Sequence, residues 1–350
     1  MPNTHRSEEV SDIKKEIDRF KTDFDSITEE IGKVIVGNRD IVEKVLIAFF
    51  AKGHVLLEGV PGMGKTLLVK SLSKALGFDF KRIQFTPDLM PADITGTQIV
   101  VEKGGGRKEF EFTPGPLFTN VLLADEINRA TPKTQSAMLE AMEERQVTVA
   151  GKTHGLREPF FVMATQNPIE MEGTYTLPEA QMDRFFFRLY IPFPKFDDLK
   201  QILRQTTINE SYTIKPVFDP DTAATRVAEM RKLVREVLVS SEMEDYITGI
   251  ILASHPDIKG MQNTTTDGDN ISDLTGRYVT YGAGPRGAQA VTLAAKANAL
   301  LDGRPNIYEG DVNKVAVSAL NHRMLLNFEA DADNIKSQHI IEKILEKLEK

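Results

Sequence analysis

The amino-acid sequence predicts an α/β fold in which a parallel sheet, flanked by helices and carrying inserted β-hairpins, is followed by a smaller all-α domain. Up to about residue 194, apolar strand-like runs alternate with helical patterns and glycine-rich turns. From about residue 195 onward, nearly the whole sequence has helical periodicity. Ile191-Pro192-Phe193-Pro194 separates the two parts, because two prolines interrupt both a helix and a central strand.

These patterns divide the chain into four parts. We expect an N-terminal helix over residues 1–34, an α/β core over 35–194, a helical domain over 195–330 and a C-terminal helix over 331–350.

The N-terminal helix is predicted from about Ser11 to Val34. Its apolar residues recur three and four positions apart and form one stripe: Ile13, Ile17, Phe20, Phe24, Ile27 and Ile31. A coiled coil would show the same stripe, but about three to four sustained heptads are needed before a coil is assigned. We therefore favour packing against the chain's own core. A second helix, Asp40–Lys52, and a buried strand, Val55–Leu57, follow.

Two segments are predicted to be hairpin insertions. In the first, β-prone runs over Ile94–Glu102 and Lys108–Phe112 flank Gly104-Gly105-Gly106. In the second, Gln146–Ala150 and Phe160–Ala164 flank a stretch rich in turn residues.

The composition is that of an ordinary folded protein. The chain has 350 residues, of which 41 % are apolar and 27 % charged, so a large core is expected. Cysteine is absent, which excludes disulfides, thiolate zinc sites, iron–sulfur clusters and cysteine nucleophiles. The net charge of −8 disfavours a globally basic nucleic-acid-binding protein.

No targeting or membrane segment is indicated. The first residues lack the apolar stretch of a signal peptide. The longest apolar run, Val45–Ala51, is far shorter than the ~20 residues that span a bilayer. We therefore expect a soluble cytoplasmic protein.

The strongest motif is Gly59-Val60-Pro61-Gly62-Met63-Gly64-Lys65-Thr66, which matches the phosphate-loop pattern G-x-x-x-x-G-K-[ST]. It lies between a predicted strand and a predicted helix, Leu67–Leu76, as the pattern requires. Glycines let the backbone N–H groups turn inward around phosphate oxygens, and the following helix adds its partial positive charge. Lys65 is expected to reach the outer phosphates and the Thr66 hydroxyl to bind Mg²⁺.

Acidic and amide side chains follow two further buried strands. Val121-Leu122-Leu123-Ala124 ends in Asp125 and Glu126. Asp125 is placed to hold Mg²⁺ through water, and Glu126 to act as general base toward the attacking water, which favours ATP hydrolysis. Asn167 follows the strand Phe160–Ala164 and is placed to orient that water, although Asn before Pro168 is also a common turn opener.

Three segments resemble the AAA+ ATPases in order and spacing: Gly59–Thr66, Leu122–Ala130 and Ala164–Pro168. Two more, Leu177–Phe185 and Gly282–Gly287, are similar to the MoxR family, although the family usually has Ser before the proline where this chain has Gly284. The resemblance covers about Val34 to Asn327. It implies a phosphate-loop AAA+ core with a helical lid, in the clade whose hairpins lie within helix 2 and before the sensor 1 strand.

The resemblance also implies a role for each motif residue. Lys65 and Thr66 belong to Walker A, Asp125 and Glu126 to Walker B, and Asn167 is sensor 1. Arg184 is the arginine finger and Arg286 is sensor 2, while Thr66 and Asp125 hold Mg²⁺. The residues expected to bind ATP are Val36, Gly37, Gly59, Pro61, Gly62, Met63, Gly64, Lys65, Thr66 and Leu67.

Elementary helix electrostatics distinguishes the two arginines. Arg286 follows Pro285, a residue favoured at the first helical position, so it is expected in the first turn of a helix ending near Leu301. A cation there opposes the helix dipole, and a bound phosphate would account for it. Arg184 is expected late in a short helix that starts near Pro178, where a cation is locally favourable and a purely structural role remains open.

MoxR proteins are thought to be chaperone-like ATPases that mature or remodel other proteins, many of which carry a von Willebrand factor A domain. The resemblance therefore implies Mg²⁺-dependent ATP hydrolysis by a homo-oligomeric ring, with a hexamer expected, and a protein substrate.

Other functions compete with this one. Related hairpin-bearing AAA+ proteins are nucleic-acid motors, and the hairpins carry Lys103, Arg107, Lys108, Lys152, His154 and Arg157. Glutamates among them blunt the basic charge that phosphate tracking needs, so nucleic acid is not the expected partner. A metal-chelatase motor subunit is a further alternative. A non-hydrolysing scaffold is disfavoured by the presence of both Asp125 and Glu126.

Overall fold

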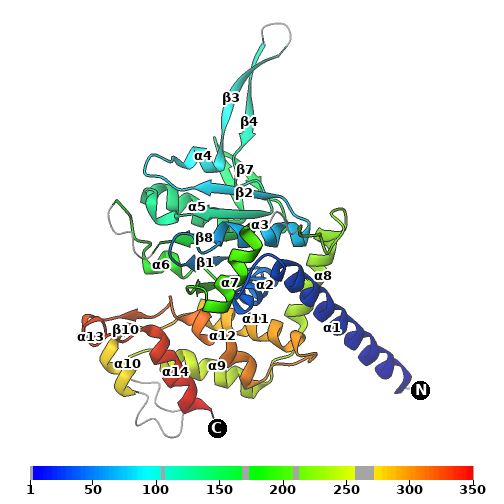
Figure 1. Ribbon diagram of the computed structural model, residues 1–350, viewed down its shortest axis with the longest axis vertical. Coiled ribbons are helices and arrows are strands. Elements are labelled where there is room, and N and C mark those ends of the chain that lie inside the picture. Colours follow the sequence, from blue (N-terminus) through cyan, green and yellow to red (C-terminus); the bar gives the residue numbers. More distant parts are fainter. Residues whose placement is uncertain (1–2, 104–106, 168–172, 208–212, 257–271, 350) are drawn as a thin grey trace.

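The computed structural model describes residues 3–103, 107–167, 173–207, 213–256 and 272–349. A sheet with helices on both faces forms the upper part of the molecule in Figure 1, and a helical part lies below it. The predicted glycine turn at 104–106 and Pro168 lie outside the described residues.

The central sheet confirms the predicted α/β class. Its strand order is β2-β5-β8-β1-β9, and every neighbouring pair is parallel. The strands are β1 (Val55–Glu58), β2 (Phe80–Gln84), β5 (Val121–Asp125), β8 (Phe161–Gln166) and β9 (Phe187–Tyr190). Because all are parallel, their carboxyl ends meet at one edge of the sheet and their amino ends at the opposite edge. The edge strand β2 was not expected from the sequence, since most of its residues are polar and at least partly exposed.

Both faces of the sheet are buried, which explains the continuous apolar runs. Alternate residues of one strand enter two separate cores: Leu57 packs on one face and Leu56 on the other. The first core contains α2 and α3, and the second contains Met138 and Met142 of α5. The helices of this part are α2 (Arg39–Phe50), α3 (Lys65–Leu76), α4 (Pro91–Thr95), the 3₁₀ helix η1 (Ile127–Arg129), α5 (Pro132–Glu144) and α6 (Glu179–Met182).

The N-terminal helix α1 (Asn3–Gly32) packs against the chain's own core, as predicted. Phe20, Ile27 and Ile31 are completely buried, whereas Ile13 near the free end is half exposed. The helix contacts α2 and α3 of the α/β part and also the helical part, where Arg226 donates a 2.6 Å hydrogen bond to the Asp23 carboxylate. It therefore joins the two parts.

The first predicted hairpin is present and projects from the top of the molecule in Figure 1. It is formed by β3 (Gly96–Lys103) and β4 (Arg107–Pro114), which pair antiparallel from end to end. Ile94, expected to open its first strand, lies instead in α4, because Pro91 and Asp93 favour a helical turn there.

The second hairpin prediction was half wrong. Its strands are β6 (Gln146–Val149) and β7 (Lys152–Gly155). Phe160–Ala164 does not pair with β6. Phe161–Ala164 lies in β8, between β5 and β1 at the centre of the sheet, because completely buried apolar residues cannot lie on an exposed hairpin.

The second half of the chain is mainly helical, as predicted. Its helices are α7 (Phe196–Thr207), α8 (Ala223–Glu236), α9 (Ser241–Ala253), α10 (Ser272–Tyr278), α11 (Pro285–Leu301), α12 (Glu309–Leu320), α13 (Phe328–Ala332) and α14 (Ser337–Leu348). A short antiparallel pair, β10 (Val279–Tyr281) and β11 (Leu325–Leu326), interrupts them. In the described ranges, no helix has both the length and the apolar character that crossing a membrane requires.

Candidate active site

The phosphate loop, Asp125 and Asn167 lie together at the carboxyl edge of the sheet. The phosphate loop follows β1, Asp125 ends β5, and Asn167 follows β8. Because β8 pairs with both β5 and β1, these three strand ends are adjacent, and Asn167 lies beside the strand carrying Asp125, as expected. Asn167 is buried there, with 5 % of its surface exposed.

The phosphate loop has the backbone that a bound anion requires. Gly62 and Gly64 have φ of 84° and 76°, in the left-handed region that favours glycine. Lys65 begins α3, whose amino end has neither a capping side chain nor an acid in its first turn. No acid of that turn opposes a bound anion, and the helix dipole favours an anion there. The Lys65 ammonium folds back over the loop and donates a 2.6 Å hydrogen bond to the Gly59 carbonyl.

Close packing lies next to the loop and to the segment expected to bracket adenine. Gly37 has φ of 77°, and a Cβ there would lie 2.5 Å from the Asp198 carboxylate of α7. Gly59 faces Ile191, whose N–H bonds to the Glu58 carbonyl at 2.7 Å. Val36 is buried beside Gly37. The start of α7 therefore lies against Val36-Gly37, and the junction before α7 lies against the phosphate loop.

Asp125 is fixed by two donors. The Thr165 hydroxyl of β8 donates to Oδ1 at 2.6 Å, and Arg82 of β2 donates to Oδ2 through Nη2 at 2.7 Å and through Nε at 3.0 Å. Thr165 also accepts a 2.8 Å hydrogen bond from the Glu126 N–H, so it ties the two acids together.

Glu126 adopts an unusual backbone conformation for a residue other than glycine. Its φ is 58° and its ψ is 51°, a left-handed conformation that functional sites often hold at a cost. Its carboxylate accepts hydrogen bonds from Gln84 at 2.6 Å and from Arg129 at 2.9 Å. The edge strand β2 therefore supports both acids, Asp125 through Arg82 and Glu126 through Gln84.

The residues at this edge fit MgATP. The open first turn of α3 suits a phosphate, and the Thr66 hydroxyl and Asp125 carboxylate are hard oxygen donors of the kind that Mg²⁺ prefers.

The two arginines lie at the opposite edge of the sheet. Arg184 comes shortly before β9 begins, and not late in a helix as expected, because α6 ends at Met182. Arg286 lies in the first turn of α11, as expected. Both line a cavity of about 390 Å³ that also contains His54 and Phe186, the residues that precede β1 and β9.

This arrangement separates the predicted site residues into two groups. The phosphate loop, Asp125, Glu126 and Asn167 lie together, whereas Arg184 and Arg286 lie together elsewhere. β1 has four residues, so the two edges of the sheet are at least roughly 10 Å apart. In this structure both arginines turn to Glu143 at the amino edge, away from the phosphate loop.

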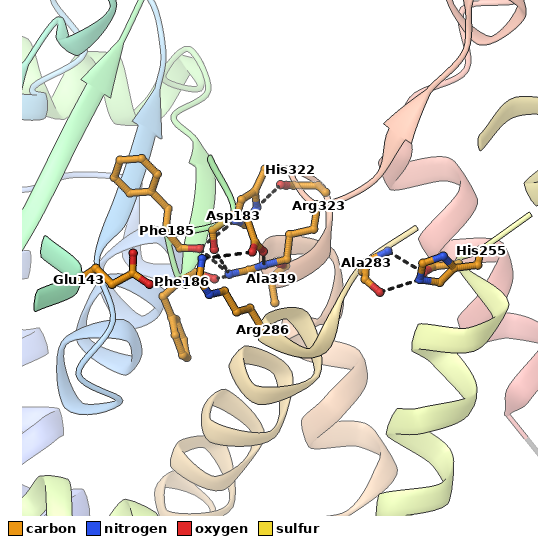
Figure 2. A network of polar contacts seen from close by, with 12 residues as sticks. Glu143, Asp183, Phe185, Phe186, His255, Ala283, Arg286, Ala319, His322 and Arg323 are labelled. Carbon is orange, nitrogen blue, oxygen red and sulfur yellow. Dashed lines mark hydrogen bonds and ion pairs between the residues drawn. The ribbon is translucent and has the colours of Figure 1, made fainter. Parts of the chain in front are cut away.

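A clamp from the lid holds the backbone before β9. Arg323 is buried: its Nη2 donates to the Phe185 carbonyl at 2.7 Å and its Nε to the Asp183 carboxylate at 2.8 Å. The ring of His322 lies 2.9 Å from the Phe185 carbonyl, which only accepts, so Nε2 carries the proton. Figure 2 shows these side chains converging on the segment 183–186. Burial, assisted by the Arg323 charge, lowers the pKa of His322 well below its usual value, so the ring is neutral.

Sequence reasoning missed several residues that support the site. Arg82 and Gln84 were not predicted because β2 was not recognised. Glu143 was not predicted because an acid at the end of an amphipathic helix is common. His322 and Arg323 gave a detectable signal, since charged and polar residues directly follow the apolar helix α12.

Comparison with known proteins agrees with this architecture. Residues 54–187 match the ATPase family associated with various cellular activities (AAA), and residues 271–344 match the AAA lid domain. YeaC of Bacillus subtilis is 44 % identical over 91 % of both chains. Chaperone MoxR1 of Mycobacterium tuberculosis is 39 % identical over 91 % of this chain and 79 % of its own length. A crystal structure of a Cytophaga hutchinsonii protein superposes with a TM-score of 0.85, at 38 % identity, over 97 % of this chain and 98 % of that one.

Proposed function

The chain belongs to the MoxR family of AAA+ ATPases, and from this premise we propose that it hydrolyses MgATP between adjacent subunits of a ring and uses the energy to remodel partner proteins. One observation carries the proposal. The phosphate-binding residues and the two arginines lie at opposite edges of one sheet, so a complete site requires two copies of the chain. Such a head-to-tail contact closes into a ring when the rotation between subunits permits it.

At the carboxyl edge, each side chain has a distinct task. Lys65 and the first turn of α3 bind the outer phosphates, and Val36-Gly37 borders the adenine. Thr66 and Asp125 would hold Mg²⁺, which would supply positive charge to the phosphate oxygens. Glu126 takes the proton from the attacking water, and Asn167 orients that water. Gln84 and Arg129 keep the Glu126 carboxylate in place before the substrate arrives.

At the amino edge, Arg184 and Arg286 extend toward the nucleotide of the neighbouring subunit. Their guanidinium groups stabilise the charge that develops on the transferring phosphoryl group. Arg184 has a guanidinium side chain about one-third exposed, and Arg286 is nearly half exposed, so both are accessible to a neighbour.

The projecting hairpin supports a protein partner. Val100 and Phe110 face each other across β3 and β4, and more than half of each side chain is exposed. Lys103 is paired with Glu109 at 2.8 Å, which reduces the basic charge available for nucleic acid. Exposed apolar groups on such a hairpin are suited to contact unfolded or flexible protein segments.

A mixing experiment tests the shared site. Arg184→Ala and Lys65→Ala are each expected to be nearly inactive alone. In a mixed ring, an Arg184→Ala subunit contributes an intact phosphate loop, and a Lys65→Ala neighbour contributes an intact arginine. At equal amounts, about a quarter of the interfaces combine both, so roughly that share of wild-type hydrolysis should return.

The matched control mixes Lys65→Ala with Glu126→Gln. Both defects lie on the phosphate side of the interface, so no combination of these subunits restores a site. Specific activity of the wild type should also rise with protein concentration as subunits associate. Full activity in dilute monomers, or no recovery in co-assembled Arg184→Ala and Lys65→Ala, would contradict the shared site.

A further inference from the structure

The cavity at the amino edge contains a carboxylate that joins the two arginines. Glu143, in the last turn of α5, places Oε2 3.2 Å from Nη1 of Arg184 and Oε1 against Nη2 of Arg286. Arg184 belongs to the α/β core and Arg286 to the lid helix α11. Figure 2 shows Glu143 reaching toward Arg286 across the junction of these two parts. We propose that Glu143 is a positioning residue that gathers Arg184 and Arg286 into one anion-binding unit; the inference rests on the proposed function.

Glu143 stands where helix electrostatics disfavours it. An acid in the last turn of α5 faces the negative end of the helix dipole, and Arg286 in the first turn of α11 faces a positive end. Each residue is electrostatically unfavourable for its own helix, and each is paired with the opposite charge of the other. The ion pair therefore accounts for the presence of both charges, which neither helix explains alone.

The charges around the pair give Glu143 a specific task. The cavity is also lined by the cations Lys52, Arg145 and Arg235 and by the acids Glu158 and Asp183. Glu158 pairs with Arg145, and Asp183 lies 3.6 Å from Arg286, so Glu143 is the acid that contacts both Arg184 and Arg286. Without its carboxylate, the two guanidinium groups would repel each other. Glu143 therefore holds together two like charges that must later act on one phosphoryl group.

The backbones that carry these residues are independently fixed. Met142 next to Glu143 is buried in the core under α5. On the lid side, the N–H of Ala283 donates to the Ser254 hydroxyl at 2.9 Å, and the Ala283 carbonyl lies 3.0 Å from the His255 ring. Asp183 adds a weaker contact to Arg286 at 3.6 Å. Glu143 thus has to set only the side-chain directions, which a single carboxylate can do.

The test compares Glu143→Gln with Glu144→Gln, measured at saturating subunit concentration. Glu144 is the adjacent exposed acid, and its side chain makes no hydrogen bond or ion pair with the described residues. Glu143→Gln should lower kcat roughly tenfold, because misaimed arginines lose transition-state contacts, while KM for ATP stays within about twofold. Glu144→Gln should behave as the wild type, and Glu143→Asp, which keeps the charge, should retain more activity than Glu143→Gln.

A double variant separates positioning from a structural role. In the Arg184→Ala background, the added Glu143→Gln change should cost clearly less than tenfold, because one of the two arginines that Glu143 positions is gone. The inference fails if Glu143→Gln matches Glu144→Gln, if it exceeds wild-type activity, or if its loss accompanies a lower melting temperature and persists unchanged in the Arg184→Ala background. Wild-type hydrolysis by Arg184→Ala itself would instead overturn the proposed function.

Discussion

The two edges of the central sheet carry complementary chemistry that is held in different ways. At the carboxyl edge, the residues proposed to bind phosphate lie on one continuous loop and helix turn, Gly59–Leu67. At the amino edge, the charges come from the end of α5, the segment before β9, the first turn of α11 and the residues after α12. A continuous loop folds as a local unit, whereas the arginine cluster exists only while the lid is docked on the core.

This difference bears on how activity is controlled. Under the proposed function, one subunit would form the phosphate site by itself, whereas its two arginines come together only where the core and the lid are docked. Nucleotide binding is therefore expected to be robust, and hydrolysis to depend on core, lid and neighbour together.

The largest expected effect separates the roles of the two edges, hydrolysis at the amino edge and ATP binding at the carboxyl edge. Arg184→Ala should bind ATP with near-normal affinity yet hydrolyse it about 10³-fold or more slowly, as is typical when an arginine finger is lost. Lys65→Ala should instead lose tight ATP binding, because the cation nearest the outer phosphates is gone. Equilibrium binding of a fluorescent ATP analogue and single-turnover hydrolysis measure the two properties. An equal loss of affinity in both variants would place Arg184 in its own subunit's site.

A second variant sharpens the description of the carboxyl edge. Glu126→Gln should keep ATP binding but slow hydrolysis by roughly 10²-fold or more, the usual scale for loss of a general base. The amide preserves the size of the side chain and keeps one oxygen that can accept the hydrogen bonds from Gln84 and Arg129. Wild-type single-turnover rates in this variant would remove Glu126 from the proton transfer.

The smallest effect concerns pH and the amino edge. His54 is buried: Nδ1 accepts a hydrogen bond from the Val162 N–H at 3.0 Å, and Nε2 lies 3.1 Å from the Met142 carbonyl. Burial, with help from the Arg145 charge, lowers the His54 pKa to about 3. In the unfolded chain His54 takes up a proton near pH 6.5, whereas in the folded chain it stays neutral until the pH approaches 3. The free energy of unfolding from this group is therefore at its full value above pH 6.5 and falls as the pH is lowered toward 3.

The expected slope is up to about 1.4 kcal/mol of unfolding free energy per pH unit from this group alone. His54→Gln should remove that contribution, whereas His339→Gln, on an exposed part of α14, should not. Denaturant unfolding at several values between pH 7 and pH 4.5 gives the slopes. Identical slopes for His54→Gln and the wild type would show that His54 does not couple folding to protonation.

The sequence alone was sufficient for whatever depends on neighbours along the chain. The phosphate loop needs particular residues at fixed positions along the chain, so Gly59–Thr66 can be recognised from the sequence alone. The α1 stripe, the strand that ends in Asp125 and the helix that begins at Pro285 follow from periodicity and cap preferences in the same way. These signals are local because the backbone hydrogen bonds that they determine are local.

Tertiary structure decided what depends on pairing between distant segments. Phe160–Ala164 has the composition of any buried strand, and only its partners distinguish the centre of the sheet from a hairpin. The polar edge strand β2 is held by one neighbour and has no apolar alternation to reveal it. Glu143 is joined to Arg184 and Arg286 by contacts across 41 and 143 positions, and Coulomb attraction over a few ångströms leaves no trace in sequence spacing.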